Sequence, residues 1–319
     1  MESDPSHVLR RLAERIRRTP RSHLVVAIVG MCAYLTAMAL AGDSRPEQFI
    51  LWALGLFFLV WSDTTRKAFS GLVAFLLFGM IYDLLHFTQP LVRYLNIHVA
   101  GPYFLDRRLF GISTPEGVLS LNEFFSRHHW PIVDFLTGTA YIVYLYWALG
   151  FGFYLAIFRR DEKGLELLRH FAWTFLVMNL LGIATYYLFP VAPPWYVADY
   201  GLGPVHLEAR GSAAGALRWD QITGIPYFAG YYARSADVFG AVPSLHVAYP
   251  LLVFLFGLEL RKRWLDIASM ALVLVVAFAA IYLNHHYVLD VVLGVLYAVV
   301  PWGVDRSIRR RSRARERAA

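Results

Sequence analysis

Charged residues are scarce in this chain, at 17% of its 319 residues. A soluble domain usually carries about a quarter, which argues against a water-soluble enzyme. Cysteine is nearly absent too, and because Cys32 has no second cysteine to pair with, no intramolecular disulfide can form. Apolar residues make up 58% of the chain, and they gather in runs of roughly 15 to 25, long enough to cross a bilayer as helices. The composition predicts an all-α, polytopic membrane bundle.

Acidic residues are outnumbered by basic ones, and the net charge is +7. The excess arginines crowd into two flanks, residues 1–22 and 305–319, which is typical of cytoplasmic ends that lie near anionic lipids. We therefore expect no nucleic-acid partner. The first flank is predicted to be a basic amphipathic segment on the membrane surface, and the second a basic cytoplasmic tail.

About eight transmembrane helices are predicted from the apolar runs. They are Leu24–Ala41, Phe49–Ser62, Ala68–His86, Ile132–Phe158, Leu168–Phe189, Val247–Leu260, Leu265–Leu283 and Tyr287–Val304. Residues 39–41, Ala-Leu-Ala, resemble a signal-peptidase site, so the first run could instead be a cleaved signal; its length favours a retained helix.

The short loops between these helices set the orientation. Basic residues cluster in three of them: Arg66 and Lys67; Arg159, Arg160 and Lys163; Arg261, Lys262 and Arg263. These loops alternate correctly with the two basic termini if all of them are cytoplasmic. The long loops Phe87–Pro131 and Pro190–Val242, which are rich in aromatic residues, and the turn Asn284–His286 are then extracytoplasmic. The aromatic loops are predicted to form a lid on the bundle or a wall around a lipid headgroup.

Two short polar segments are predicted to meet on that outer face, Val242–His246 and Asn284–Asp290. Ionisable residues at membrane depth are costly and usually mark function. His286 and Asp290 are four residues apart, so on a helix they share a face, and the carboxylate could fix the tautomer of the imidazole and activate its other nitrogen. A purely structural ion pair between helices is the alternative.

His246 adds a second imidazole on the same face, so that one histidine could be the nucleophile and the other the proton donor of a phosphoryl transfer. Ser244 precedes it at the start of a helix, where a plain helix cap is the favoured interpretation and a phosphate contact the alternative. His246, His285, His286 and Asp290 could also bind zinc, but adjacent histidines on one helix point in different directions. We expect no metal, and His285 either contacts substrate or fills the turn.

These residues resemble the type 2 phosphatidic acid phosphatase superfamily, especially the branch of inositol phosphorylceramide synthases and sphingomyelin synthases. The matching motifs are Pro243-Ser244-Leu245-His246 and His286-Tyr287-Val288-Leu289-Asp290, with Val291, Gly294 and a segment from Phe189 to Trp195. The resemblance covers residues 68–304 and implies a six-helix catalytic core, with two additional helices at 23–67. It also implies that His286 forms a phosphohistidine, that Asp290 orients it, and that His246 protonates the leaving oxygen, without a cofactor.

The sequence departs from the phosphatase branch of that family. Ala280 stands where the phosphatases have an arginine, and the segment from Phe189 to Trp195 has no basic residue. Fewer cations suit a phosphodiester better than a dianionic phosphomonoester. Arg210, Arg218 and Arg234 could supply charge, and Arg234 is the first choice. The residues expected to contact substrate are Ser244, Arg234, His285, Asn284 and Trp195.

The resemblance therefore predicts a membrane phosphotransferase. It would move a headgroup, phosphoinositol in the favoured case, from a glycerophospholipid to ceramide and release diacylglycerol. The alternatives are a lipid phosphatase acting on phosphatidate or isoprenyl phosphates, and a non-catalytic lipid transporter or scaffold. The expected partners are phosphatidylinositol, a ceramide-like acceptor and membrane lipids, with the site in the periplasm of a bacterium or the Golgi lumen of a eukaryote.

Overall fold

A computed structural model describes residues 14–233 and 238–318, and the chain divides into two compact units. The first unit contains the residues up to Phe87 together with Gly152–Leu176, and the second contains Thr88–Phe151 and Val177–Ala319. Two long helices, α7 (Pro131–Phe158) and α8 (Glu162–Leu188), contribute to both units. Arg234 lies outside the described residues.

The first unit is built on α2 (Arg21–Leu40), α3 (Pro46–Trp61), α4 (Asp63–Leu84) and the short 3₁₀ helix η1 (Leu85–Phe87). Helix α4 begins before the predicted Ala68 because Ser62 caps it: its hydroxyl accepts a hydrogen bond from the backbone N–H of Thr65. Tyr34 and Met38 of α2 pack with Trp52 of α3 in one buried cluster. Helix α2 is thereby part of the packed unit.

A partly buried carboxylate joins the three helices of this unit. Asp83 accepts hydrogen bonds from the hydroxyl of Tyr34, from Arg45 Nη2 at 2.7 Å and from Gln48 Nε2 at 3.2 Å. With three donors around it, the carboxylate satisfies the requirement that a buried charge be paired and hydrogen-bonded. Asp83 therefore has a structural role.

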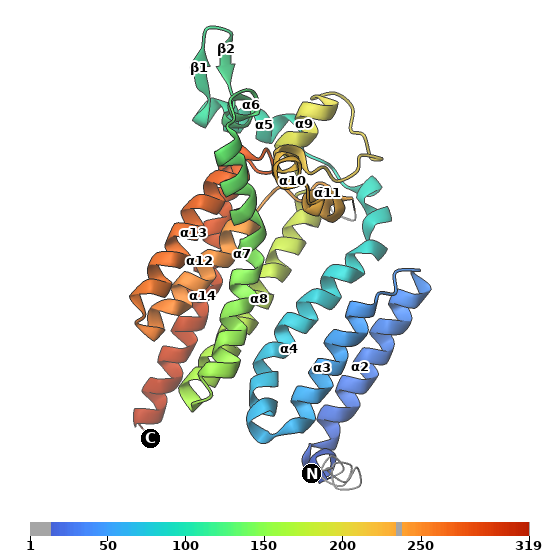
Figure 1. The fold of residues 1–319 in the computed structure, drawn as a ribbon, viewed down its shortest axis with the longest axis vertical. Coiled ribbons are helices and arrows are strands. Elements are labelled where there is room, and N and C mark those ends of the chain that lie inside the picture. The colour runs from blue at the N-terminus through green and yellow to red at the C-terminus, as the bar shows by residue number, and fades with distance from the viewer. Residues whose placement is uncertain (1–13, 234–237, 319) are drawn as a thin grey trace. The chain divides into compact units, whose positions relative to one another are not determined.

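The second unit contains the helices that carry both polar motifs. Helix α12 (Leu245–Gly257) continues into η4 (Leu258–Leu260) and is followed by α13 (Arg263–Tyr282) and α14 (Val288–Ala318). Helix α12 packs against both α13 and α14 (Figure 1). Because the chain reverses after α12 and again after α13, the first turns of α12 and α14 lie at the same end of this unit.

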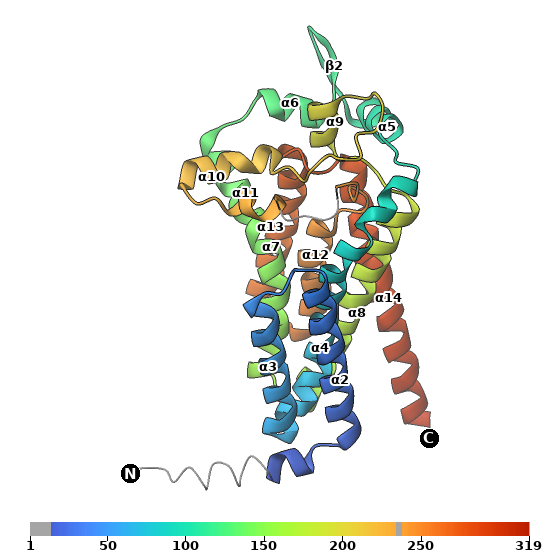
Figure 2. The same ribbon diagram turned by 90° about the vertical axis from the view of Figure 1, so that its right-hand side faces the viewer.

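Short elements gather at that end (Figure 2). They are η2 (Gln89–Tyr94), α5 (Ala100–Phe110), the antiparallel hairpin of β1 (Ile112–Thr114) and β2 (Gly117–Leu119), α6 (Leu121–Arg127), α9 (Pro194–Tyr200), η3 (Ala214–Ala216), α10 (Leu217–Thr223) and α11 (Tyr227–Tyr232). They lie in the two loops that the sequence predicts to be long and aromatic.

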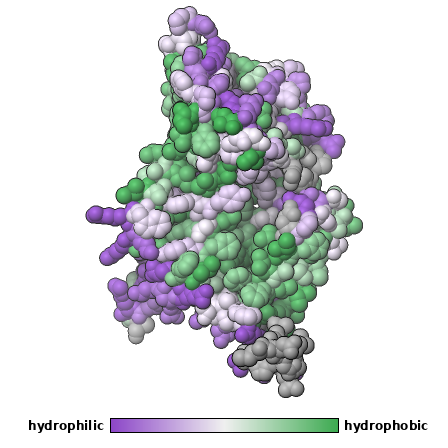
Figure 3. Space-filling view, in the orientation of Figure 1, coloured by the Kyte–Doolittle hydropathy of each residue, from purple (hydrophilic) through white to green (hydrophobic). Residues whose placement is uncertain are grey.

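Among the described residues, six helices are long and apolar enough to cross a membrane, α2, α4, α7, α8, α13 and α14, and α3 and α12 are shorter apolar helices. Large apolar side chains such as Ile267 and Leu274 are more than 60% exposed, which suits contact with lipid. In Figure 3, hydrophilic residues collect toward the helix ends of the face shown. The protein is an all-α, multi-pass membrane protein, as predicted.

All eight predicted spans are helices, and the largest difference from the predicted bounds is at the C-terminal end of the last one. Helix α14 continues to Ala318 instead of ending near Val304. The basic residues after Asp305 are therefore helical, since arginine is a good helix former even where the sequence becomes polar.

One glycine allows α14 to approach the start of α12. A Cβ atom placed on Gly294 would lie 2.2 Å from the carbonyl oxygen of Ser244, far closer than atoms can pack. The backbone of Ser244 also donates its N–H to the carbonyl of Asp290 at 2.9 Å. This approach brings the Ser244–His246 motif beside the His286–Asp290 motif.

We expect Gly294→Ala to lower the thermal unfolding midpoint in detergent, because the added methyl group must push α14 away from Ser244. Gly303→Ala, on the same helix, is the matched control, since its Cβ meets no atom within 4 Å. Replacement of a helical glycine by alanine in open space stabilises by about 0.5–1 kcal/mol. Equal behaviour of the two variants would contradict this account of the close approach.

Candidate active site

The two histidines of the motifs contact each other directly. His246 lies in the first turn of α12, His286 in the turn before α14, and His246 Nδ1 is 3.0 Å from His286 Nε2. His286 is buried, with 5% of its surface exposed. The fold therefore brings together the pair that the sequence predicts from residues 40 positions apart.

A backbone carbonyl decides which nitrogen of His286 carries the proton. His286 Nδ1 lies 2.8 Å from the carbonyl oxygen of Ala241, and a carbonyl oxygen can only accept a hydrogen bond. Neutral His286 is therefore protonated on Nδ1, and Nε2 carries the lone pair. It follows that His246 donates its Nδ1–H to His286 Nε2. The unprotonated nitrogen of His286 is therefore the one that faces His246.

Asp290 lies behind His286, on the side away from His246. Its Oδ2 is 3.5 Å from His286 Nδ1 and accepts the backbone N–H of Tyr287 at 2.8 Å. The carboxylate is almost fully buried, at 1% exposure. The predicted pairing of His286 with Asp290 is thus present as a longer ion pair, while the carbonyl of Ala241 makes the shorter contact with the same nitrogen.

The position of Ala241 depends on the segment Pro190–Ala192. Val191 bridges to His98 on one side and to Gly240 on the other, in parallel. The N–H of Val191 donates to Phe239 O at 2.8 Å, and the N–H of Ala241 donates to Val191 O at 3.3 Å. This proline-rich segment, noted in the sequence for its resemblance, therefore supports the backbone that holds His286.

Ser244 is the residue before α12, but its side chain does not cap the helix. Its hydroxyl is fully buried and has no hydrogen-bond partner among the described residues. The favoured interpretation of the side chain as a plain helix cap is therefore wrong. A buried hydroxyl without a hydrogen-bond partner costs free energy. The hydroxyl of Ser244, two residues before His246, is such a group.

His285 contacts a backbone carbonyl and two aromatic rings. Its Nε2 lies 3.2 Å from the carbonyl of Ala213, and its ring stacks on Tyr232 with centroids 4.6 Å apart and on Tyr141 with centroids 5.4 Å apart. Burial lowers the pKa of His285 to about 3, so the ring is neutral. Tyr141 also stacks on His246 at 4.2 Å. The ring of Tyr141 thus stacks on both His246 and His285.

Asn284 and Trp195 meet through the backbone. The N–H of Trp195 donates to the carbonyl of Asn284 at 3.1 Å, and Asn284 has a positive φ of 65°, a conformation that asparagine tolerates well. The indole of Trp195 is buried in an apolar cluster with Val99 and Phe239. Both residues therefore help to shape the turn that carries the histidines.

Among the predicted sources of positive charge, Arg218 is already paired. Its Nε is 2.6 Å from Asp134 Oδ1, and its guanidinium lies 5.3 Å from the ring centroid of Tyr282. Arg210 is exposed, and Arg234 lies outside the described residues. Arg218, which is partly buried, is therefore already matched by the carboxylate of Asp134.

Two residues of the site were not predicted from the sequence, Asp106 and Asn122. Asp106 of α5 is fully buried, and its Oδ1 accepts the N–H of Leu289 at 3.1 Å at the start of α14. Asn122 of α6 is buried too and donates from Nδ2 to the carbonyls of Ile281 and His286 at 2.9 and 3.0 Å. Both side chains fix the backbone around the histidine turn.

Asp106 is an unusual carboxyl group. Burial, with a smaller contribution from the charge of Asp290, raises its pKa to about 6, although the N–H donors of α14 oppose the shift. Its Oδ2 is buried and has no hydrogen-bond partner among the described residues. Asp106 therefore holds a proton at a higher pH than an exposed aspartate does.

Comparison with known proteins identifies the family of this chain. The family model of the PAP2 superfamily matches residues 105–304. This range includes all the site residues named above except His98 and Val99. The chain belongs to the PAP2 superfamily. The resemblance proposed from the two histidine motifs is confirmed.

Curated relatives point to one branch of this superfamily. The phosphoinositol dihydroceramide synthase of Bacteroides thetaiotaomicron is 36% identical over 283 residues, 88% of this chain and 91% of the relative. The inositol phosphorylceramide synthase catalytic subunit of Schizosaccharomyces pombe is 36% identical over 43% of this chain and 32% of its own length. The inositol phosphorylceramide synthase of Candida albicans is 35% identical over 41% of this chain and 28% of its own.

These relatives confirm the prediction of a phosphotransferase enzyme similar to inositol phosphorylceramide synthases. The similarity to the bacterial relative covers most of both chains, whereas the fungal alignments cover about a third of each relative or less. No solved structure matches the chain significantly.

We expect Asp106→Asn to change how stability depends on pH. Because the folded-state pKa is raised, the protonated carboxyl stabilises the fold fully below about pH 3.8, and this contribution is lost as the pH rises through about 6. Asparagine keeps an oxygen to accept the N–H of Leu289 but cannot ionise. The unfolding midpoint of the wild type should therefore fall more than that of the variant between pH 4.5 and 7.

The difference between the two profiles isolates Asp106, since every other titrating group is common to both proteins. Parallel profiles across this range would mean that Asp106 does not ionise there.

Proposed function

We propose that this protein transfers phosphoinositol from phosphatidylinositol to a ceramide-type lipid alcohol, through a phosphohistidine on His286, with release of diacylglycerol. The observation that carries the proposal is the carbonyl of Ala241, which accepts from His286 Nδ1 and leaves Nε2 as a nucleophile directed at His246. The names of the relatives, one of them similar over most of the chain, support phosphoinositol and ceramide as substrates.

In the first half-reaction, His286 Nε2 attacks the phosphorus of the donor, and the bond from phosphorus to the diacylglycerol oxygen breaks. His246, protonated on both nitrogens beside the anionic phosphodiester, gives one proton to the leaving oxygen. The phosphorylated imidazole carries a positive charge, which Asp290 and the carbonyl of Ala241 stabilise from the Nδ1 side.

In the second half-reaction, the hydroxyl of the acceptor attacks the same phosphorus while the bond to His286 Nε2 breaks. His246, now neutral, takes the proton of that hydroxyl and returns to its first state. The hydrogen bond between the two histidines, at 3.0 Å, leaves no room for a phosphoryl group. Donor binding must therefore separate His246 from His286 before the attack.

Transfer is favoured over phosphate release by the charges and rings around the histidines. Arg218 is neutralised by Asp134 at 2.6 Å, which suits a singly charged phosphodiester better than a dianionic monoester. Tyr141 and Tyr144 cover His246 with ring centroids 4.2 and 4.5 Å away. A site lined in this way limits water and leaves the phosphohistidine to the lipid acceptor.

We further propose that the site faces the extracytoplasmic side and that both termini are cytoplasmic. The first turns of α12 and α14, which carry His246 and Asp290, lie at one end of the second unit, and the arginines that follow Asp305 lie at the other. Excess arginine marks the cytoplasmic side of a membrane protein.

The decisive test is a lipid-product assay on purified protein in nanodiscs, supplied with fluorescent ceramide and phosphatidylinositol. We expect a new phosphosphingolipid, together with an equal amount of diacylglycerol. His286→Ala should lower the rate by a factor of at least about 10³, because it removes the nucleophile. His128→Ala is the matched control, since this histidine is exposed, and its ring stacks on Phe124 and contacts the Phe124 carbonyl through Nδ1.

Other outcomes would assign the protein elsewhere. Release of inorganic phosphate from phosphatidate, without product from ceramide, would indicate a lipid phosphatase. Full activity of His286→Ala would contradict the phosphohistidine, and a trapped phosphohistidine in wild-type protein given donor alone would support it.

A further inference from the structure

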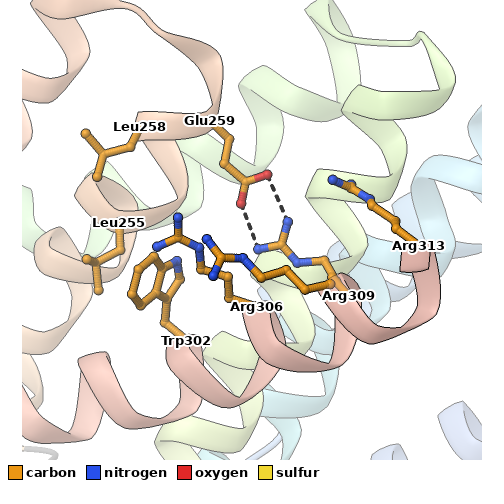
Figure 4. A pocket seen from close by; sticks show the side chains of 8 residues that line it. Leu255, Leu258, Glu259, Trp302, Arg306, Arg309 and Arg313 are labelled. Atoms are coloured by element: carbon orange, nitrogen blue, oxygen red, sulfur yellow. Dashed lines mark hydrogen bonds and ion pairs between the residues drawn. The ribbon is translucent and has the colours of Figure 1, made fainter. Parts of the chain in front are cut away.

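A pocket of about 280 Å³ lies between the end of α12 and the second half of α14, far from the histidines (Figure 4). We call it the arginine pocket. Its lining residues all belong to the second unit and combine apolar and basic side chains: Leu255, Leu258, Glu259, Trp302, Arg306, Arg309, Arg310 and Arg313.

Arg309 is the structural member of the arginine pocket. It is buried to 6% exposure, and its two Nη atoms contact the carboxylate of Glu259 at 2.8 and 2.7 Å. Its Nε contacts Asp305 at 2.7 Å. Figure 4 shows the paired contact that joins Glu259 to Arg309. The pair with Glu259 thus holds α14 against η4, and the pair with Asp305 lies within α14.

Arg306 and Arg310 have no matching carboxylate among the residues that line the pocket. Arg306 lies with its guanidinium 4.9 Å from the ring centroid of Trp302, and Arg310 follows one turn later on the same face. Like charges three and four residues apart on a helix repel each other. The side-chain N–H of Trp302 is buried and has no hydrogen-bond partner among the described residues. These groups together form a site for an anion.

The pocket also has an apolar side, and its depth matches a membrane interface. Leu255, Leu258 and the ring of Trp302 line it beside the arginines. Arg306 stands 18 residues after Val288, the first residue of α14, so it lies about 27 Å along the helix from the catalytic end. The hydrocarbon core of a bilayer is about 30 Å thick. The arginines therefore begin where the lipid headgroups of the opposite leaflet are expected.

We propose that the arginine pocket binds an anionic phospholipid of the leaflet opposite the histidine site, with its phosphate between Arg306 and Arg310 and its glycerol and upper acyl chain against Leu255, Leu258 and Trp302. A free phosphate ion would use the arginines alone, whereas a phospholipid uses both sides of the pocket. The site is separate from the proposed reaction, which takes place at the other end of α12 and α14.

The test is native mass spectrometry of the full-length protein released from nanodiscs that contain phosphatidylcholine and phosphatidylglycerol. We expect the wild type to retain phosphatidylglycerol in preference to phosphatidylcholine. The double variant R306Q/R310Q should lose this preference by roughly ten- to thirtyfold, since two arginines are removed from the phosphate. R315Q/R317Q is the matched control, because it removes the same charge from exposed positions on the same helix outside the pocket.

A second variant, Trp302→Phe, keeps the apolar ring and removes the N–H, and it should retain less phosphatidylglycerol than the wild type. His286→Ala should bind as the wild type does, so that a failure of the proposed reaction leaves this result unaffected. Equal losses of phosphatidylglycerol in both double variants would show only a general attraction of the lipid to basic residues. That result would overturn the proposal that the arginine pocket binds it. Displacement of the lipid by an equal concentration of inorganic phosphate would overturn the assignment to a phospholipid.

Discussion

The hydrogen bond from His286 Nδ1 to the carbonyl of Ala241 is the constraint on which the rest of the site depends. A carbonyl cannot exchange donor and acceptor roles as a hydroxyl or an imidazole can, so it fixes the proton on one nitrogen. The carbonyl in turn is held by Val191, whose backbone bridges to Gly240 and to His98. Segments far apart in the sequence are therefore needed to position the carbonyl that fixes the proton on His286 Nδ1.

The close approach of α14 to α12 is the second requirement. It rests on Gly294 and on the hydrogen bond from the N–H of Ser244 to the carbonyl of Asp290. Since the two helices also carry Glu259 and Arg309 at their other ends, they are joined at both ends of the second unit. The contacts at the two ends therefore keep α14 packed against α12 and η4 along its length.

Much of this arrangement can be predicted from the sequence, because the length of an apolar run predicts a membrane-spanning helix and because His286 and Asp290 are four residues apart. The residues that support the histidine turn cannot be predicted in this way. Asp106 contacts Leu289 across 183 positions and Asn122 contacts His286 across 164, and neither lies in a pattern that marks a partner. The loops that carry them are aromatic but lack helical periodicity, so α5 and α6 were not predicted either. The side chain of Ser244 also differs from expectation, since a residue at a helix start need not use its hydroxyl as the cap.

Several of the hydrogen bonds that hold His286 and Asp290 in place come from main-chain atoms: the carbonyl of Ala241 and the amides of Ser244 and Tyr287. Every residue type except proline offers the same two groups. Side chains around His286 can therefore differ while its protonation stays the same. In an alanine scan such a scaffold is largely invisible, because the substitution leaves the atoms that matter in place.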